Sequence, residues 1–232
     1  MLNVVLYTAF FYDLCTMTKP ALIYCYDAYC GWCYGFSPVI QKIAATFQNQ
    51  LDVEVLSGGM MLPEKPVHIK TTAGYIATAY KQVEETTGIR FGQDYLWHIM
   101  NPEDSDWFPH SEKPAIALCI IKSLYPERAL EFATGVQYAL HFEGRDLTDD
   151  EAYRHMLDAY GISAEHFYEK LHSDAFKEAA YYDFALVKQL QVTGYPTVFI
   201  QTEELKFHMV ARGYTDYNTL EKRIRLVLET LH

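Results

Sequence analysis

Apolar residues follow two different spacings along the chain, and these spacings predict where strands and helices alternate. Residues 21–26 are apolar at nearly every position, which is typical of a strand buried on both faces. Apolar residues then recur every three or four positions from Phe36 to Phe47, which indicates an amphipathic helix. Alternation of apolar and acidic residues at 51–56 predicts a second strand. Together these elements predict a βαβ unit with parallel strands and a right-handed crossover.

The middle of the chain, from about Met60 to Asp174, has a helical pattern almost throughout. Thr148 and Glu151 are spaced as a capping box, and Ser163 is the expected N-cap of the helix that follows. The expected helices cover Lys70–Glu85, Pro114–Ser123, a segment from Pro126 to about Leu140, a segment from the capping box to Gly161, and a short helix through Leu171.

The last part of the chain returns to a mixed pattern. We expect a helix over residues 173–191, strands at 197–201 and 206–210 joined as an antiparallel hairpin, and a final amphipathic helix from Leu220 to Leu231. The whole order is β-α-β, a helical block, then α-β-β-α. It predicts an α/β fold with a helical domain inserted between its two halves.

The cysteine motif Cys30-Gly31-Trp32-Cys33 falls where the first strand turns into the first helix. A helix N-terminus offers unpaired N–H groups and the positive end of the dipole, and both stabilise a thiolate at Cys30. Cys33, one turn deeper, is positioned to attack a mixed disulfide at Cys30. This setting is typical of a redox motif.

Two other interpretations of the cysteine pair are less favoured. Structural zinc usually takes four ligands from two such pairs, and the sequence has no second CxxC motif or closely spaced Cys/His pair. A purely structural disulfide would close a very short loop and would restrain the unfolded chain little. We therefore prefer redox chemistry.

A second signal lies far downstream, where Gly194-Tyr195-Pro196-Thr197 precedes a β-branched run. Taken alone, the bond before Pro196 is expected to be trans, because cis bonds are a small minority. Taken with the CxxC motif, the sequence resembles the thioredoxin superfamily, whose active sites pair CxxC with a cis-proline loop. That resemblance implies that Tyr195-Pro196 is cis, faces the cysteines and offers backbone groups to an extended substrate.

The inserted helices narrow the resemblance to the DsbA family of thiol-disulfide oxidoreductases, and to its cytosolic FrnE-like branch, which includes predicted protein-disulfide isomerases. Tyr26-Asp27, residues 32–38 and residues 144–148 also carry this resemblance. It implies a thioredoxin-fold domain of residues 19–60 and 175–232, with residues 61–174 as the inserted helical domain. Residues 1–18 would be an N-terminal extension.

The same resemblance implies roles for single residues. Asp27 would raise the pKa of the Cys30 thiol if it were near and ionised. A role as a turn residue explains the presence of Asp27 equally well. Thioredoxin has a buried acid six residues before its first cysteine, where this chain has Tyr24, so a carboxylate relay from that position is absent. The expected catalytic residues are Cys30, Cys33 and Pro196, and the expected substrate-binding residues are Gly31, Trp32 and Tyr195.

The remaining chemistry-bearing side chains are expected to serve mainly in packing. Histidine is dispersed and shows no metal-ligand spacing with cysteine, and cysteine within an apolar strand or helix is inert by default. The residues concerned are Cys25, Cys119, His68, His98, His110, Trp97 and Trp107.

Composition and the N-terminal segment limit the choice of partners. The chain has 232 residues, half of them hydrophobic, and a net charge of −11, so no basic surplus exists for a nucleic-acid partner. The apolar stretch in residues 1–18 lacks a preceding basic residue and a cleavage site, and it is too short to span a bilayer. Met17 is an alternative start. We expect no membrane partner and a cytoplasmic location.

Three classes of function remain. The first is a thiol-disulfide oxidoreductase or isomerase that acts on protein or small-molecule thiols and disulfides. The second is a glutathione-dependent isomerase or transferase related to 2-hydroxychromene-2-carboxylate isomerase and kappa-class glutathione transferases, which typically carry Ser where this chain has Cys30. The third is a binding or chaperone module with a vestigial CxxC.

The intact cysteine pair favours the first class. No bound cofactor and no metal are expected, and glutathione is a candidate redox co-substrate. The sequence leaves open whether the protein is a monomer or a homodimer.

Overall fold

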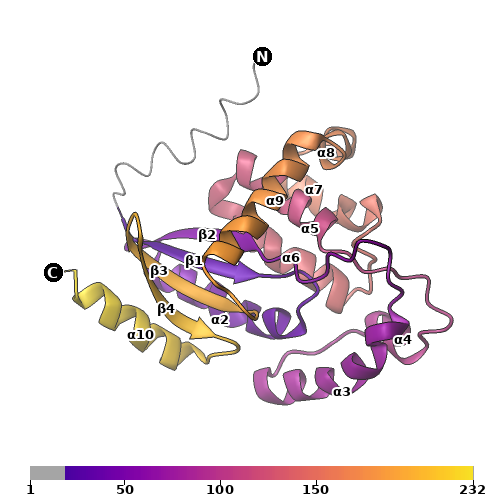
Figure 1. The fold of residues 1–232 in the computed structure, drawn as a ribbon, viewed down its shortest axis with the longest axis horizontal. Coiled ribbons are helices and arrows are strands. Elements are labelled where there is room, and N and C mark those ends of the chain that lie inside the picture. Colours follow the sequence, from indigo (N-terminus) through magenta and orange to yellow (C-terminus); the bar gives the residue numbers. More distant parts are fainter. Residues whose placement is uncertain (1–18, 232) are drawn as a thin grey trace.

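The computed structural model describes residues 19–231, which form a four-stranded sheet with helices on both faces and beside one edge (Figure 1). The strands are β1 (Ala21–Tyr26), β2 (Asp52–Ser57), β3 (Thr197–Glu203) and β4 (Lys206–Arg212), in the order β2-β1-β3-β4. β1 and β2 are parallel, whereas β3 is antiparallel to β1 and β4 is antiparallel to β3. The predicted βαβ unit and the predicted hairpin are both confirmed.

Both faces of β1 are buried, as its continuous apolar run predicts. One face, with Tyr24 and Tyr26, packs against helix α2 (Gly31–Phe47). The other face, with Ile23 and Cys25, packs against helix α9 (Asp174–Gln189). Helix α10 (Tyr217–Glu229) lies along α2 and β4 and completes the first layer.

The helical part between β2 and α9 packs against β2, α2 and α9. One of its helices, α4, was not predicted, because its eight residues are too few to show a repeating apolar stripe and no side chain caps its start, whereas Ser163 marks the start of the equally short α8. None of the described helices is long and apolar enough to cross a bilayer. The elements are α3 (Lys70–Thr87), α4 (Gln93–Met100), α5 (Glu112–Leu124), η2 (Pro126–Arg128), α6 (Ala129–His141), η3 (Asp150–Tyr153), α7 (Arg154–Leu157), η4 (Asp158–Tyr160) and α8 (Ala164–Leu171).

The predicted capping box at Thr148 and Glu151 does not form. The Asp149 carboxylate accepts the Glu151 N–H at 3.0 Å, and the Thr148 hydroxyl donates to the Asp146 carboxylate at 2.8 Å. Two aspartates thus compete successfully for the groups that a capping box would pair. The segment then folds as short 3-10 and α pieces rather than as one helix. The predicted cap at Ser163 is confirmed, since its hydroxyl accepts the His166 N–H.

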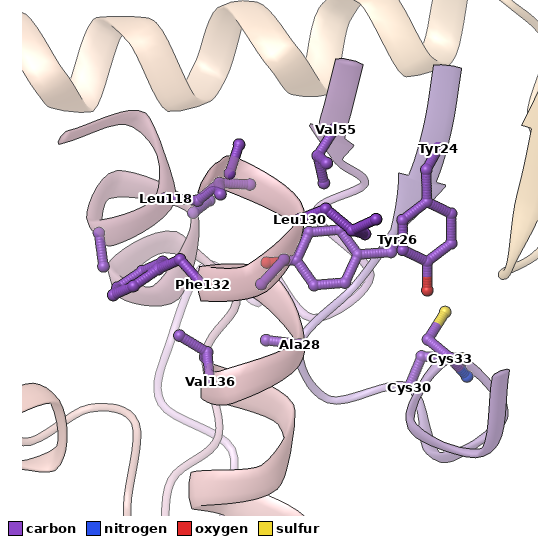
Figure 2. Close-up of a cluster of buried hydrophobic side chains, with 14 of the residues drawn as sticks. Tyr24, Tyr26, Ala28, Cys30, Cys33, Val55, Leu118, Leu130, Phe132 and Val136 are labelled. Atoms are coloured by element: carbon purple, nitrogen blue, oxygen red, sulfur yellow. Dashed lines mark hydrogen bonds between the residues drawn. The ribbon is translucent and has the colours of Figure 1, made fainter. Parts of the chain in front are cut away.

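The sheet and the inserted helices share one hydrophobic core. Val55 of β2, Leu118 of α5, and Leu130 and Val136 of α6 are all buried and belong to one cluster, which Figure 2 shows in close-up. The domain boundaries at residues 61 and 174 therefore remain a prediction, because the packing is continuous across them.

A buried cation also ties these parts together. The Lys122 ammonium of α5 donates to the Val55 carbonyl at 2.9 Å and pairs with Glu54 at 2.5 Å and with Asp183 of α9 at 3.3 Å. Burial alone would lower the pKa of Lys122, but the two carboxylates raise it above its ordinary value. Burial raises the pKa of Asp183 to about 6, against the opposing effect of Lys122.

We expect Lys122→Met to destabilise the fold by about 3–5 kcal/mol, because it leaves the Asp183 carboxylate buried without its cation. Urea unfolding at neutral pH, followed by tryptophan fluorescence, measures the change. The double variant Lys122→Met/Asp183→Leu removes both buried charges and should lose less stability than the single variant. A single variant as stable as the double variant would contradict this account of the cluster.

Candidate active site

Cys30 occupies the N-cap position of α2. Its backbone N–H donates to the Asp27 carbonyl at 3.1 Å, which closes the turn after β1. Its sulfur accepts the Cys33 N–H at 3.3 Å, in the place that a serine or aspartate oxygen usually takes at a helix start. The positive end of the α2 dipole therefore faces this sulfur, as the strand-to-helix turn predicts.

Cys33 lies one turn deeper and is not accessible. It is 0% exposed, whereas Cys30 is 7% exposed, so a substrate meets Cys30 first. Burial, followed by the hydrogen bond and the charge of Cys30, raises the pKa of Cys33 well above that of a free thiol. The four cysteines within residues 19–231 are free thiols, and the site is therefore in its dithiol form.

The loop before β3 faces Cys30. The Tyr195-Pro196 peptide bond is cis, and the Cys30 thiol donates to the Tyr195 carbonyl at 3.6 Å. The predicted juxtaposition of the CxxC motif and this loop is thus present in the structure. The residue after β4 holds this loop in turn, because the Gly213 N–H donates to the Pro196 carbonyl at 2.7 Å.

The Tyr195 side chain reaches toward the segment after β2. Its hydroxyl donates to the Gly58 carbonyl at 2.9 Å, in the segment after β2. A Cβ atom on Gly58 would lie 2.1 Å from the Tyr195 ring, so any other residue at that position would displace the ring. Sequence reasoning assigned Tyr195 to substrate binding, and the structure limits any such contact to its backbone and the exposed part of its ring.

Gly31 and Trp32 lie at the half-buried entrance of the site. A Cβ atom on Gly31 would be 3.4 Å from the Phe91 ring, and the Trp32 ring is 6.5 Å from that of Tyr214. Phe91 and Tyr214 were not predicted from the sequence, because each comes from a segment distant in sequence from the cysteines. Trp32 and Tyr214 form an aromatic rim beside the motif.

Asp27 is a buried carboxylate that joins three segments. It accepts the Tyr29 N–H at 3.0 Å, the Met60 N–H at 2.7 Å and the Ser111 hydroxyl at 3.1 Å. Burial raises its pKa, and these hydrogen bonds oppose the rise. Its effect on the pKa of Cys33 has two parts: the Asp27 backbone lowers it and the Asp27 charge raises it. Asp27 is therefore a turn residue and an electrostatic neighbour of the thiol at once.

Two buried polar residues of α6 hold the same turn, and sequence reasoning missed both. The Gln137 amide donates to the Asp27 carbonyl at 3.3 Å and accepts the Ser37 hydroxyl of α2 at 2.9 Å. The His141 ring nitrogen Nε2 lies 3.2 Å from the Ala28 carbonyl. Burial lowers the pKa of His141 to about 3, so the ring is neutral and donates this bond. The sequence signal is two polar residues one turn apart within an apolar stripe.

Three of the other side chains considered from the sequence, His68, His98 and Cys25, pack against their neighbours as predicted. His98 stacks on Trp107 with ring centroids 3.9 Å apart, and His68 packs edge-on against Phe108. Burial raises the pKa of Cys25 to about 12, which makes it unreactive. The described residues contain no group of three or more His, Cys, Asp or Glu side chains that could hold a metal ion.

Comparison with known proteins places this geometry in a family. The thioredoxin family model matches residues 24–222. A candidate protein disulfide isomerase from Nitrosomonas europaea is 22% identical with a TM-score of 0.81, over 92% of this chain and 100% of that chain. The cytosolic disulfide reductase DsbM from Pseudomonas aeruginosa is 25% identical with a TM-score of 0.70, and the match covers 91% of this chain and 98% of that chain. A second DsbM structure contains GSH.

Among curated proteins, the ClpXP adapter protein SpxH of Bacillus subtilis is 20% identical over 212 residues, which is 88% of this chain. The match spans 66% of the length of that relative. Because the family model covers most of the sequence and the fold agrees with that of DsbM, the protein belongs to the thioredoxin family and to its DsbA-like members, which include cytosolic forms.

Proposed function

We propose that this protein is a thiol-disulfide oxidoreductase in which Cys30 exchanges with the substrate and Cys33 resolves the mixed disulfide. One observation carries the proposal. The Cys30 sulfur caps α2, accepts the Cys33 N–H and faces the Tyr195 carbonyl, while Cys33 is buried behind it. An accessible thiol with a buried thiol one helical turn away is the arrangement that two-step exchange requires.

The exchange proceeds in two balanced steps when the dithiol form meets a substrate disulfide. The Cys30 thiolate attacks one substrate sulfur, the substrate S–S bond breaks, and one substrate thiolate leaves with an electron pair. Cys33 then loses its proton to solvent and attacks the Cys30 sulfur, which releases the second substrate thiolate. The substrate gains two electrons, and the protein is left with a Cys30–Cys33 disulfide.

The substrate would lie between the loop at Tyr195-Pro196 and the rim of Trp32 and Tyr214. An extended peptide could pair with the backbone of this loop as an added strand. The aromatic rim offers apolar contact to residues beside the reacting sulfur. These features suit a protein disulfide or a small disulfide equally well, so the proposed substrate class is thiols and disulfides in general.

We propose glutathione as the co-substrate that returns the cysteines to the dithiol form, and the cytoplasm as the compartment. The likeness to a cytosolic disulfide reductase that has also been solved with GSH supports both points. Tight binding of glutathione without exchange would instead favour the glutathione-dependent isomerase or transferase class. Retention of full activity in the Cys33→Ser variant would favour a binding or chaperone module.

Serine variants of the two cysteines should separate the two steps. Cys33→Ser should accumulate a stable mixed disulfide with glutathione at Cys30, because the resolving thiol is missing. Cys30→Ser should form almost none, because Cys33 is buried and its pKa is raised. Intact-protein mass spectrometry after exposure to glutathione disulfide measures the adduct. Equal labelling of the two variants would refute the assignment of roles.

Gly58→Ala should slow disulfide reduction by about tenfold or more, because its Cβ atom displaces the Tyr195 ring and with it the carbonyl that faces Cys30. Gly74→Ala is the control, since a Cβ atom there meets nothing within 4 Å and Gly74 lies in α3 rather than in the loop. Reduction of insulin and far-ultraviolet circular dichroism of both variants report activity and folding. Full activity of a folded Gly58→Ala protein would show that the position of Tyr195 is unimportant.

The reduction potential of the cysteine pair should lie nearer to the thioredoxin value of about −270 mV than to the DsbA value of about −120 mV. Gly31 and Trp32 add no positive charge that would stabilise the reduced form. Equilibration in glutathione buffers, followed by thiol alkylation, gives the potential. A value near that of DsbA would make the protein an oxidant of its substrates, and the absence of any disulfide would remove the redox proposal.

A further inference from the structure

Tyr24, in the centre of β1, has a buried hydroxyl that the proposed exchange does not yet use. The residue is 0% exposed, and its ring is fixed between Tyr26 and Phe36, with ring centroids at 5.6 and 5.9 Å. Figure 2 shows its hydroxyl pointing toward Cys30 and Cys33. Buried hydroxyl groups nearly always have a hydrogen-bond partner, so an unpaired one requires an explanation.

Neither Tyr24 nor Tyr26 makes a hydroxyl hydrogen bond of ordinary geometry within the described residues. The two hydroxyls face different groups. The neighbour of the Tyr24 hydroxyl is the Cys33 thiol, and the neighbour of the Tyr26 hydroxyl is Ser57. In Figure 2 the Tyr26 hydroxyl lies on the side of its ring away from the cysteines. The two tyrosines thus share strand, face and burial, and differ in what their hydroxyls meet.

The Tyr24 hydroxyl can act as a donor and not as a base. Burial, followed by the charges of Cys33 and Cys30, raises its pKa well above the ordinary value for tyrosine, so the phenol keeps its proton. A neutral thiol is a weak acceptor for this proton, which fits the unpaired state of the hydroxyl in the dithiol form. A thiolate is a strong acceptor, and hydrogen bonds to charged groups are the stronger ones.

We propose that Tyr24 is a further catalytic residue, whose hydroxyl donates a hydrogen bond to the Cys33 sulfur when that sulfur becomes a thiolate in the resolving step. The proposal rests on the proposed function. The bond is weak while Cys33 is a neutral thiol and strong while its thiolate attacks, so it stabilises the transition state more than the ground state. An unpaired buried donor in the resting protein is the cost of this arrangement.

The resolving step stays balanced with this addition. Cys33 gives its proton to solvent, its thiolate attacks the Cys30 sulfur, and the substrate thiolate leaves and takes up a proton. Tyr24 keeps its own proton throughout and loses its acceptor when the Cys30–Cys33 bond forms. The other titratable groups that affect the pKa of Cys33 are Cys30 and Asp27 from the turn. Tyr26 of β1 and Tyr195 of the loop before β3 are neutral phenols whose own pKa the charge of Cys33 raises.

Single-turnover reduction of an aromatic disulfide that releases a coloured thiolate tests the proposal. The first release reports attack by Cys30, and the second reports resolution by Cys33. Tyr24→Phe should leave the first phase unchanged and slow the second by about tenfold or more, the effect of one hydrogen bond to a charged group. The pH midpoint of the second phase should rise by about one unit in this variant.

Tyr26→Phe is the matched control, and both of its phases should follow those of the wild type. Cys33→Ser should lack the second release, and any slow release that it still shows measures the contribution of other thiols. Incorporation of 3-fluorotyrosine at position 24 provides a second variant that keeps the ring; its hydroxyl is a stronger donor and should accelerate the second phase.

The outcomes separate the two proposals. A single release from wild-type protein would mean that the proposed function fails. Two releases from wild type, with Tyr24→Phe resolving as fast as wild type or slowed no more than Tyr26→Phe, would overturn the role of Tyr24 alone. Should Tyr24→Phe fail to fold, an unchanged second phase in the fluorotyrosine protein would overturn it equally.

Discussion

The burial of the Asp27 carboxylate is the constraint on which the rest of the site depends. A charged group in the interior is costly unless its oxygens are hydrogen-bonded, and here donors come from Tyr29, Met60 and Ser111. Its carbonyl meanwhile receives the Cys30 N–H. One residue therefore fixes the redox turn, the segment after β2 and the start of α5 relative to one another. The Cys30 sulfur is aligned with the α2 N-terminus as a result.

The inserted helices are consequently part of the active site rather than an appended cap. Gln137 and His141 reach from α6 to two carbonyls of the redox turn, and Gln137 also binds α2 through Ser37. Lys122 makes the same kind of connection at the opposite face, where it binds β2 and α9. Because these bonds are buried, the position of the cysteines depends on the N-terminal βαβ unit, the inserted helices and the C-terminal part of the chain together.

The sequence predicted what is encoded locally. The strand run, the CxxC motif and the Pro196 loop each lie within a few residues, and their periodicity or spacing identifies them. Gln137, Ser111 and Gly58 could not be predicted, because their roles depend on atoms that lie far away in sequence. The capping box failed for a different reason: Asp149 offered a closer acceptor than Thr148. Local competition between polar side chains is not visible in spacing alone.

The pairing of β1 with β3 has a consequence for how the site comes into being. Ala21 pairs with Gln201, and Cys25 pairs with Thr197, so the central strand gains its second neighbour only after most of the chain has been made. Contacts between such distant segments form slowly, because a long loop must close first. During synthesis the two thiols therefore precede the loop that faces them by more than half of the chain. The site therefore lacks one of its two sides until the C-terminal segment has been synthesised, and it becomes complete only when the whole sheet has formed.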